Sequence, residues 1–159
     1  MFSLTVGLPD DGLMLGAYPE LLITAFLTAI ASAAMGLFVS SLFNNADRAM
    51  TVAPILLMPQ ILFSGLIFEL DGATEYISWF AVCRWSMEGF GTTANLNKLP
   101  GEINEVYGSM GQAFERPAED FFKFTEGHML LDWGILILFT AAFLVLAKVV
   151  LAKVGKEKS

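Results

Sequence analysis

One cysteine and one histidine occur among the 159 residues, and no asparagine stands in an N-x-S/T acceptor sequence. With Cys83 alone, no disulfide can form within the chain, and an unpaired buried thiol is favoured over a bridge to a second chain. Phosphate-binding loops, dinucleotide fingerprints, H-E-x-x-H, C-x-x-C and nucleophile elbows are all missing. We therefore expect the chain to be no enzyme in its own right and to hold no cofactor or metal ion.

Positive charge is also scarce, since nine lysines and arginines face sixteen acidic residues and leave a net charge of −7. Such an acidic chain is a poor partner for nucleic acid. Apolar residues are abundant instead, at 55% of the total, and the mean hydropathy is +0.62. A soluble domain of this size cannot bury that much apolar surface. The composition indicates an all-α integral membrane protein.

Three apolar runs, at 21–43, 51–68 and 129–151, are long enough to cross a membrane. As helices they would measure about 34, 27 and 34 Å, against a hydrocarbon core of about 30 Å. We predict a transmembrane helix for each run. The opening residues MFSLTVGL are apolar but break at once into GLPDDG, and we interpret them as the end of a preceding helix.

The distribution of basic residues predicts the orientation of these helices. Four lysines lie in the last twelve residues, whereas 69–128 holds four basic residues among ten acidic ones. The positive-inside rule therefore places the tail 152–159 in the cytoplasm and 69–128 outside. Alternation then makes 1–20 an external hairpin and 44–50 a cytosolic turn.

Small residues recur every four positions along the first predicted span. They form two stripes: Ala25, Ala29 and Ala33, and Ser32, Gly36 and Ser40. Such stripes let helices approach closely, and in lipid this packing drives helix association. We expect the helix to lie at a crowded interface, with packing inside the chain favoured and a dimer contact as the alternative.

The second predicted span contains Pro54 and Pro59, each of which removes a backbone donor and predicts a kink. Prolines are tolerated in a span where neighbouring helices or a cavity satisfy the freed carbonyls. Pro54, Met58, Ile61 and Gly65 share one apolar face, which suits a greasy substrate. Packing of the same face against neighbouring helices is at least as well supported by periodicity alone.

The outer segment 69–128 begins with an aromatic stretch that is too polar to span. Thr74 is a plausible N-cap for a helix over 75–89, which we interpret as re-entrant or interfacial. Irregular backbone at membrane depth survives only where protein or a water-filled cavity surrounds it, as in transport pathways. Arg84 and Glu88 are four residues apart and can pair, and a structural pair is favoured over a direct transport role. A compact external cap follows.

His128 and Asp132 lie four residues apart at the outer end of the last predicted span. Two metal ligands could use this spacing, but one histidine and one carboxylate are too few for a site. We interpret Asp132 instead as a helix-end carboxylate that is stabilised by the helix dipole.

The order of motifs adds a family resemblance. FSGLIF closes the second predicted span, WFAVCRWSMEGF follows after a turn, and VGLPDDG precedes the first span. This order resembles the G subfamily of ABC transporters, in which an FSGLL-like sequence ends the fifth transmembrane helix and an aromatic run forms an external re-entrant hairpin. VGLPDDG is similar to the family's hairpin between helices three and four. The resemblance implies a partial six-helix exporter domain containing helices four to six, a re-entrant helix and an external cap.

The resemblance also implies roles for individual residues. It places Pro54, Met58 and Ile61 toward the substrate cavity, Leu66 and Ile67 in an apolar plug or gate, and Arg84, Glu88 and Gly89 in the re-entrant hairpin. The implied partners are a nucleotide-binding ATPase domain that holds ATP and Mg²⁺, a second permease half of the same or a different chain, and membrane lipid. The implied substrate is lipid-like or amphipathic.

The chain departs from the family pattern in several ways. The ATPase domain, helices one and two and the coupling loop are not in this sequence, and the family's external cysteines are not reproduced. We therefore expect a C-terminal fragment or separately encoded piece of a permease in a bacterial inner membrane. An alternative is a small accessory membrane protein that binds helices of a larger complex. A membrane enzyme using Glu88, His128 and Asp132 is the third hypothesis, but no nucleophile accompanies them.

Overall fold

The computed structural model describes residues 13–43, 45–65, 72–98 and 125–157. Five helices lie in these ranges: α2 (Ala17–Ser41), α3 (Ala46–Leu62), α4 (Ala73–Ser78), α5 (Val82–Thr93) and α7 (Glu126–Glu157). The same ranges contain no strand. The described part of the chain therefore confirms the predicted all-α class.

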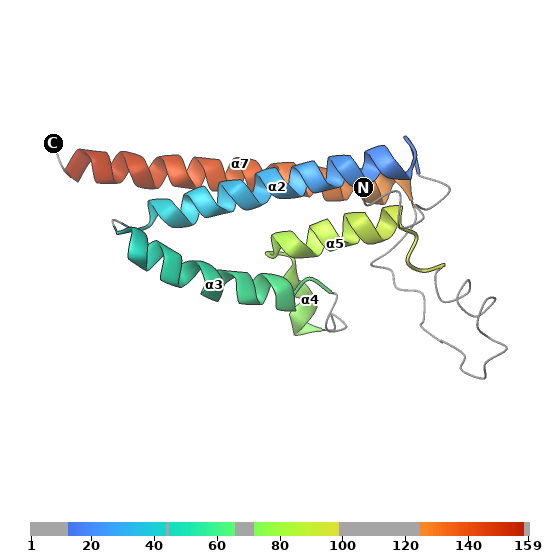
Figure 1. Cartoon of the computed structure of the whole chain (residues 1–159), viewed down its shortest axis with the longest axis horizontal. Coiled ribbons are helices and arrows are strands. Elements are labelled where there is room, and N and C mark those ends of the chain that lie inside the picture. The colour runs from blue at the N-terminus through green and yellow to red at the C-terminus, as the bar shows by residue number, and fades with distance from the viewer. Residues whose placement is uncertain (1–12, 44, 66–71, 99–124, 158–159) are drawn as a thin grey trace.

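Two of the described helices, α2 and α7, are long and apolar enough to cross a membrane. They lie side by side over much of their length, and α7 ends at the same end of the molecule as the turn that joins α2 to α3 (Figure 1). α3 has 17 residues and runs back from that turn, with both prolines inside it. Its helix begins within the predicted cytosolic turn, because the side chain of Asn45 caps it by accepting a hydrogen bond from the Asp47 N–H at 3.1 Å.

The small-residue stripes of α2 do not pack against the other described helices. Ala25, Ala29 and Ala33 are exposed, as are the three residues of the second stripe. The face of α2 that packs against the rest of the chain carries Thr24 and Ala31 instead. The expectation that the stripes pack inside the chain is therefore wrong for the described residues. The face with Thr24 and Ala31 packs there instead, and the Thr24 hydroxyl bonds to Trp133 on α7.

The predicted single helix over 75–89 is also wrong, because α4 ends at Ser78 and α5 begins at Val82. Between them the backbone of Ala81 is extended, with φ −90° and ψ 119°. Side chains of α5 cap the end of α4: Arg84 donates to the Glu75 carbonyl at 3.1 Å, and the Trp85 indole donates to the Trp79 carbonyl at 3.1 Å. These donors satisfy carbonyls that a continuous helix would have bonded internally.

The interior of the described part of the chain is rich in polar groups. A small apolar cluster of Ala31, Val82, Trp85 and Leu136 joins α2, α5 and α7. The buried polar and charged residues are Glu20, Thr24, Ser64, Ser78, Arg84, Ser86, Glu88, Thr92, Thr93 and Asp132. Large apolar side chains cover the outside of α2, α3 and α7. This distribution suits a lipid environment, in which interhelical polar contacts and close packing hold helices together.

Candidate functional site

α5 is the most enclosed helix of the described chain. Nine of its twelve residues are buried, and it lies against both α2 and α7 (Figure 1). Hydroxyl groups form part of this contact, because the Thr28 hydroxyl on α2 donates to the Ser86 hydroxyl on α5 at 2.9 Å. A helix too short and too polar to span thus packs against both candidate spans, which also contact each other.

Gly89 marks the closest approach of α5 to its neighbours. A Cβ atom at this position would lie 3.1 Å from Cγ2 of Thr24 on α2 and 3.9 Å from Cβ of Asp132 on α7. The first distance is shorter than the separation of about 3.5–4.0 Å at which carbon atoms attract most strongly. The absence of a side chain at Gly89 therefore lets three helices meet.

Thr24 carries a second contact at this junction. Its hydroxyl accepts a hydrogen bond from the Trp133 indole N–H at 2.8 Å and donates to the Glu20 carbonyl at 2.9 Å. The hydrogen bond from Trp133 joins α2 to α7 directly. The polar face of α2 therefore contacts both α5 and α7.

Arg84 is held on the α4 side of the site. Its Nη1 donates to the Ser78 hydroxyl at 2.7 Å as well as to the Glu75 carbonyl. Its guanidinium carbon lies 5.8 Å from the ring centre of Trp79 and 5.1 Å from that of Trp85, within cation–π range. A lysine could not reproduce this set of contacts, because it lacks the planar fork of donors.

Glu88 links Arg84 to the last helix. Its Oε2 lies 3.6 Å from Arg84 Nε, which confirms the predicted pairing, and its Oε1 lies 2.9 Å from His128 Nε2. Burial raises the pKa of the Glu88 carboxyl, while the charges of His128 and Arg84 act in the opposite direction. The contact between Glu88 and His128 joins α5 to α7, although the two residues are 40 positions apart in the sequence.

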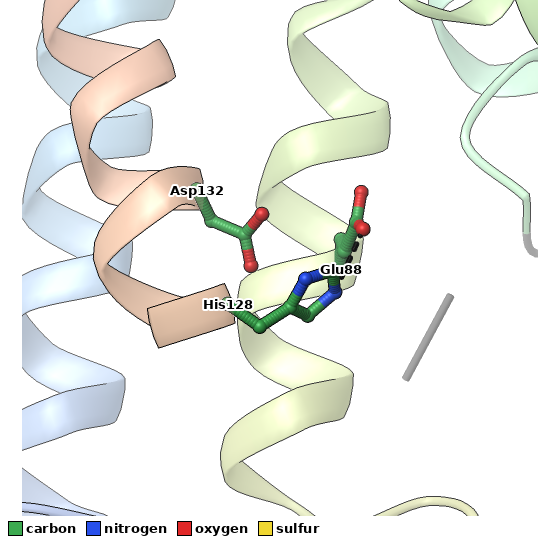
Figure 2. A group of neighbouring side chains, drawn as sticks. All are labelled: Glu88, His128 and Asp132. Carbon is green, nitrogen blue, oxygen red and sulfur yellow. Dashed lines mark ion pairs between the residues drawn. The ribbon is translucent and has the colours of Figure 1, made fainter. Parts of the chain in front are cut away.

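Asp132 completes a cluster of three possible ligands. One ligand atom each from Glu88, His128 and Asp132 lies within 4.8 Å of the other two. Figure 2 shows the Asp132 carboxylate directed from α7 toward the other two side chains. Asp132 is completely buried, and neither of its oxygens has a hydrogen-bond partner among the described residues.

The helix-end interpretation of Asp132 is wrong. α7 begins at Glu126, so Asp132 lies in its second turn, beyond the first turn in which the dipole acts strongly. The sequence indicated that His128 and Asp132 share a face of the helix. It carried no signal that Glu88 meets them, because the contact is between residues far apart in the chain.

Glu20 is a buried residue that sequence reasoning placed in an external hairpin. It is fully buried in the first turn of α2, and its carboxylate accepts hydrogen bonds from the backbone N–H groups of Leu13, Met14 and Leu15 at 3.1, 2.6 and 2.9 Å. These bonds hold the chain entering α2. An acidic residue just before an apolar run was the available signal, and its carboxylate needed donors close by.

The predicted pathway residues lie elsewhere. Pro54, Met58 and Ile61 are exposed on α3, whereas Arg84 and its neighbours on α5 are buried. The predicted pathway residues thus lie on α3, and the predicted hairpin residues lie on α5. The predicted plug residues Leu66 and Ile67 lie outside the described residues.

Comparison with known proteins adds the family. The chain is 29% identical over 102 residues to the ABC transporter ATP-binding/permease protein Rv1747 of Mycobacterium tuberculosis, covering 61% of this chain and 12% of that protein. It is 26% identical over 140 residues to the ABC transporter ATP-binding protein/permease wht-1 of Caenorhabditis elegans, covering 77% of this chain and 21% of that protein. The chain thus matches only a minor part of the length of either relative. No solved structure gave a significant match.

Residues 5–92 match the family described as ABC-2 type transporter, which is more than half of the chain. The matched region includes α2, α3, α4 and nearly all of α5, so it contains Arg84, Glu88 and Gly89. The apolar helices and the family match agree on a membrane domain. The chain belongs to the ABC-2 type transporter family and is a membrane permease part of an ABC transporter.

Proposed function

We propose that the chain forms part of the substrate pathway and external gate of an ATP-driven exporter for a lipid-like or amphipathic substrate. The observation that carries this proposal is the burial of α5, a short helix rich in polar groups, against the two candidate spans. Non-spanning backbone at membrane depth is tolerated where protein surrounds it or where it lines a water-filled cavity. A gate at the outer end of a pathway meets that condition.

The exposed face of α3 supports the pathway part of the proposal. Met58 is 65% exposed and Ile61 is 54% exposed, and Pro54 lies on the same face. Methionine adapts its shape to different apolar ligands, and a proline in a span favours a helix beside a cavity. Exposed apolar residues here would contact substrate on one side of a cavity.

The remaining wall of the cavity would come from a second permease half. The stripe of Ala25, Ala29 and Ala33 is exposed on α2, and small residues in a row permit the close approach of another helix. Both relatives combine ATP-binding and permease in their names. We propose that ATP and Mg²⁺ are held by an ATPase domain outside this chain, and that the lysine-rich end of α7 lies in the cytoplasm of a bacterial cell.

The proposal is tested first by ATPase activity. The chain would be expressed together with its ATPase partner, reconstituted in lipid vesicles, and compared with vesicles containing the partner alone. We expect vanadate-sensitive hydrolysis that depends on this chain and rises with a fluorescent amphipathic probe. If no ATPase associates with the chain, the exporter proposal fails and the accessory-protein alternative replaces it.

A substitution pair then tests the pathway face. Met58→Trp places a bulky ring on the proposed face, and we expect loss of probe-stimulated hydrolysis with basal hydrolysis retained. Leu56→Trp is the matched control, because Leu56 lies on the opposite side of α3 and is also exposed. Equal effects of both variants would contradict the assignment of this face.

The plug assignment is tested separately. Alanine at both Leu66 and Ile67 removes the proposed apolar barrier, and we expect higher probe leak or basal hydrolysis in the vesicles. Unchanged leak and turnover would remove this assignment without affecting the pathway face.

A further inference from the structure

The unpartnered carboxylate of Asp132 is the observation from which the inference starts. Asp132 has no exposed surface, and neither oxygen accepts a hydrogen bond from the described residues. A buried carboxylate in that state is costly unless a proton or a cation neutralises it. Ionisable residues inside membrane domains are rare and are usually functional. The carboxylate points toward Glu88 and His128, as Figure 2 shows.

The guanidinium of Arg84, on the same helix as Glu88, already has other contacts. Arg84 faces Glu88 with its Nε and donates its Nη1 to Ser78 and to the Glu75 carbonyl. The Nε2 atom of His128 contacts the other carboxylate oxygen of Glu88, Oε1, at 2.9 Å. The two carboxylates and the imidazole therefore converge on one small volume between α5 and α7.

The distances suit a small metal ion. Each residue supplies one ligand atom, and all three atoms lie within 4.8 Å of one another. Tetrahedral ligands at about 2.0–2.1 Å from Zn²⁺ are separated by about 3.3 Å. The 2.9 Å contact between Glu88 and His128 is already close to that separation, so the arrangement needs only small side-chain movements.

We propose that Glu88, His128 and Asp132 bind one divalent transition-metal ion, with Zn²⁺ the best-matched metal, at the contact between α5 and α7. One imidazole and two carboxylates form a ligand set that Zn²⁺ accepts in tetrahedral geometry, with water in the fourth position. Mg²⁺ and Ca²⁺ prefer six or more oxygen ligands, so they fit this set poorly. A bound ion would fasten the buried helix to the second candidate span and neutralise Asp132. This proposal does not depend on the transport function.

The composition of the chain makes the site easy to identify. His128 is the only histidine in the sequence, so a single imidazole bound to the metal must come from it. The full chain would be purified in detergent with a histidine-free affinity tag and titrated with ZnCl₂ in a calorimeter. We expect one Zn²⁺ per chain, no binding of MgCl₂ under the same conditions, and an X-ray absorption spectrum of the zinc with one imidazole and only oxygen ligands besides.

Substitutions test the assignment of the ligands. Asp132→Asn keeps the side-chain shape and removes the anionic ligand, and His128→Gln removes the imidazole. We expect each variant to bind Zn²⁺ at least about tenfold more weakly, because even the loss of an outer-shell partner costs that much. Glu126→Gln is the matched control, since Glu126 is an exposed carboxylate on the same helix. It should bind as the unmodified chain does.

The possible outcomes separate the proposal from its competitors. Absence of Zn²⁺ binding by the unmodified chain would overturn it and leave a proton as the neutralising partner of Asp132. Unchanged binding by Asp132→Asn or His128→Gln would also overturn it, because the ion would then lie on other acidic residues. Circular dichroism confirms that each variant is folded, and either of the two ligand variants alone decides the question if the other fails to fold.

Discussion

Gly89→Ala tests the close packing of the three helices at one atom. The added Cβ would lie 3.1 Å from Thr24 Cγ2, so a side chain or helix must shift. Adding a methyl to a well-packed interior costs about 1–3 kcal/mol. Alanine also gains about 1 kcal/mol of helix propensity over glycine, which opposes this cost. The steric cost must therefore be measured by comparison with a second Gly→Ala variant, in which helix propensity rises equally but no contact is added.

Gly134→Ala is that matched control. Gly134 lies inside α7, and a Cβ there would meet nothing within 4 Å. The propensity gain is common to both variants, so their difference in unfolding free energy isolates the contact with Thr24. We expect Gly89→Ala to be less stable than Gly134→Ala by about 1–3 kcal/mol. Reversible unfolding of the chain in mixed detergent micelles, followed by circular dichroism, measures both.

A second substitution identifies the clashing atom. Thr24→Ser removes Cγ2 and keeps the hydroxyl that accepts from Trp133. In the double variant with Gly89→Ala, the remaining contacts of the new Cβ lie at 3.7 and 3.9 Å, which is ordinary van der Waals distance. We expect a favourable coupling energy of about 1 kcal/mol or more between the two substitutions. Equal stability of Gly89→Ala and Gly134→Ala, or additive effects in the double variant, would refute the packing described for this junction.

Three other substitutions test the polar contacts. Trp133→Phe removes the indole N–H that donates to Thr24 at 2.8 Å, and we expect the unfolding free energy to fall by about 0.5–1.5 kcal/mol in the same assay. An unchanged value would show that the bond contributes nothing to stability. Glu20→Gln leaves one oxygen for the three N–H groups of residues 13–15, and hydrogen exchange there should become about tenfold faster, since bonds to charged groups contribute about 1.5–3 kcal/mol. Exchange at the original rate would contradict the role of the carboxylate. Arg84→Lys loses the fork of donors that caps α4 and the stacking on two indole rings, and we expect a loss of about 1–3 kcal/mol together with altered tryptophan fluorescence.

The apolar runs predicted the two long helices because length and hydropathy are local properties. Length and hydropathy did not predict the residues at which the helices begin and end. α2 begins at Ala17 because Gly16, with φ +94°, allows the turn before it and Glu20 binds the backbone that precedes it. Neither feature is apolar, so neither contributes to the hydropathy of the run.

The segment 75–89 shows why the break between α4 and α5 and the contacts of α5 could not be predicted from local sequence patterns. Aromatic and polar residues over 75–89 predicted one helix, and the break before α5 arises from donors on Arg84 and Trp85 that reach back to α4. The pairing of Arg84 with Glu88 was predictable because it follows helix periodicity. The contact of Glu88 with His128 was not, because no local rule relates residues that are 40 positions apart.

The distribution of residues explains why polar contacts have so large a role in this chain. A soluble protein hides its large apolar side chains, but here they cover the outside of both candidate spans while charged groups lie within. Lipid tails are as apolar as leucine, so burial of apolar surface gives little preference for one helix arrangement over another. Directional contacts must then determine where α5 lies: Thr28 with Ser86 from α2, and His128 with Glu88 from α7. Each contact joins α5 to a different span, so breaking either one leaves α5 joined to the other span. The position of α5 therefore depends on polar side chains from both spans, and not on apolar burial alone.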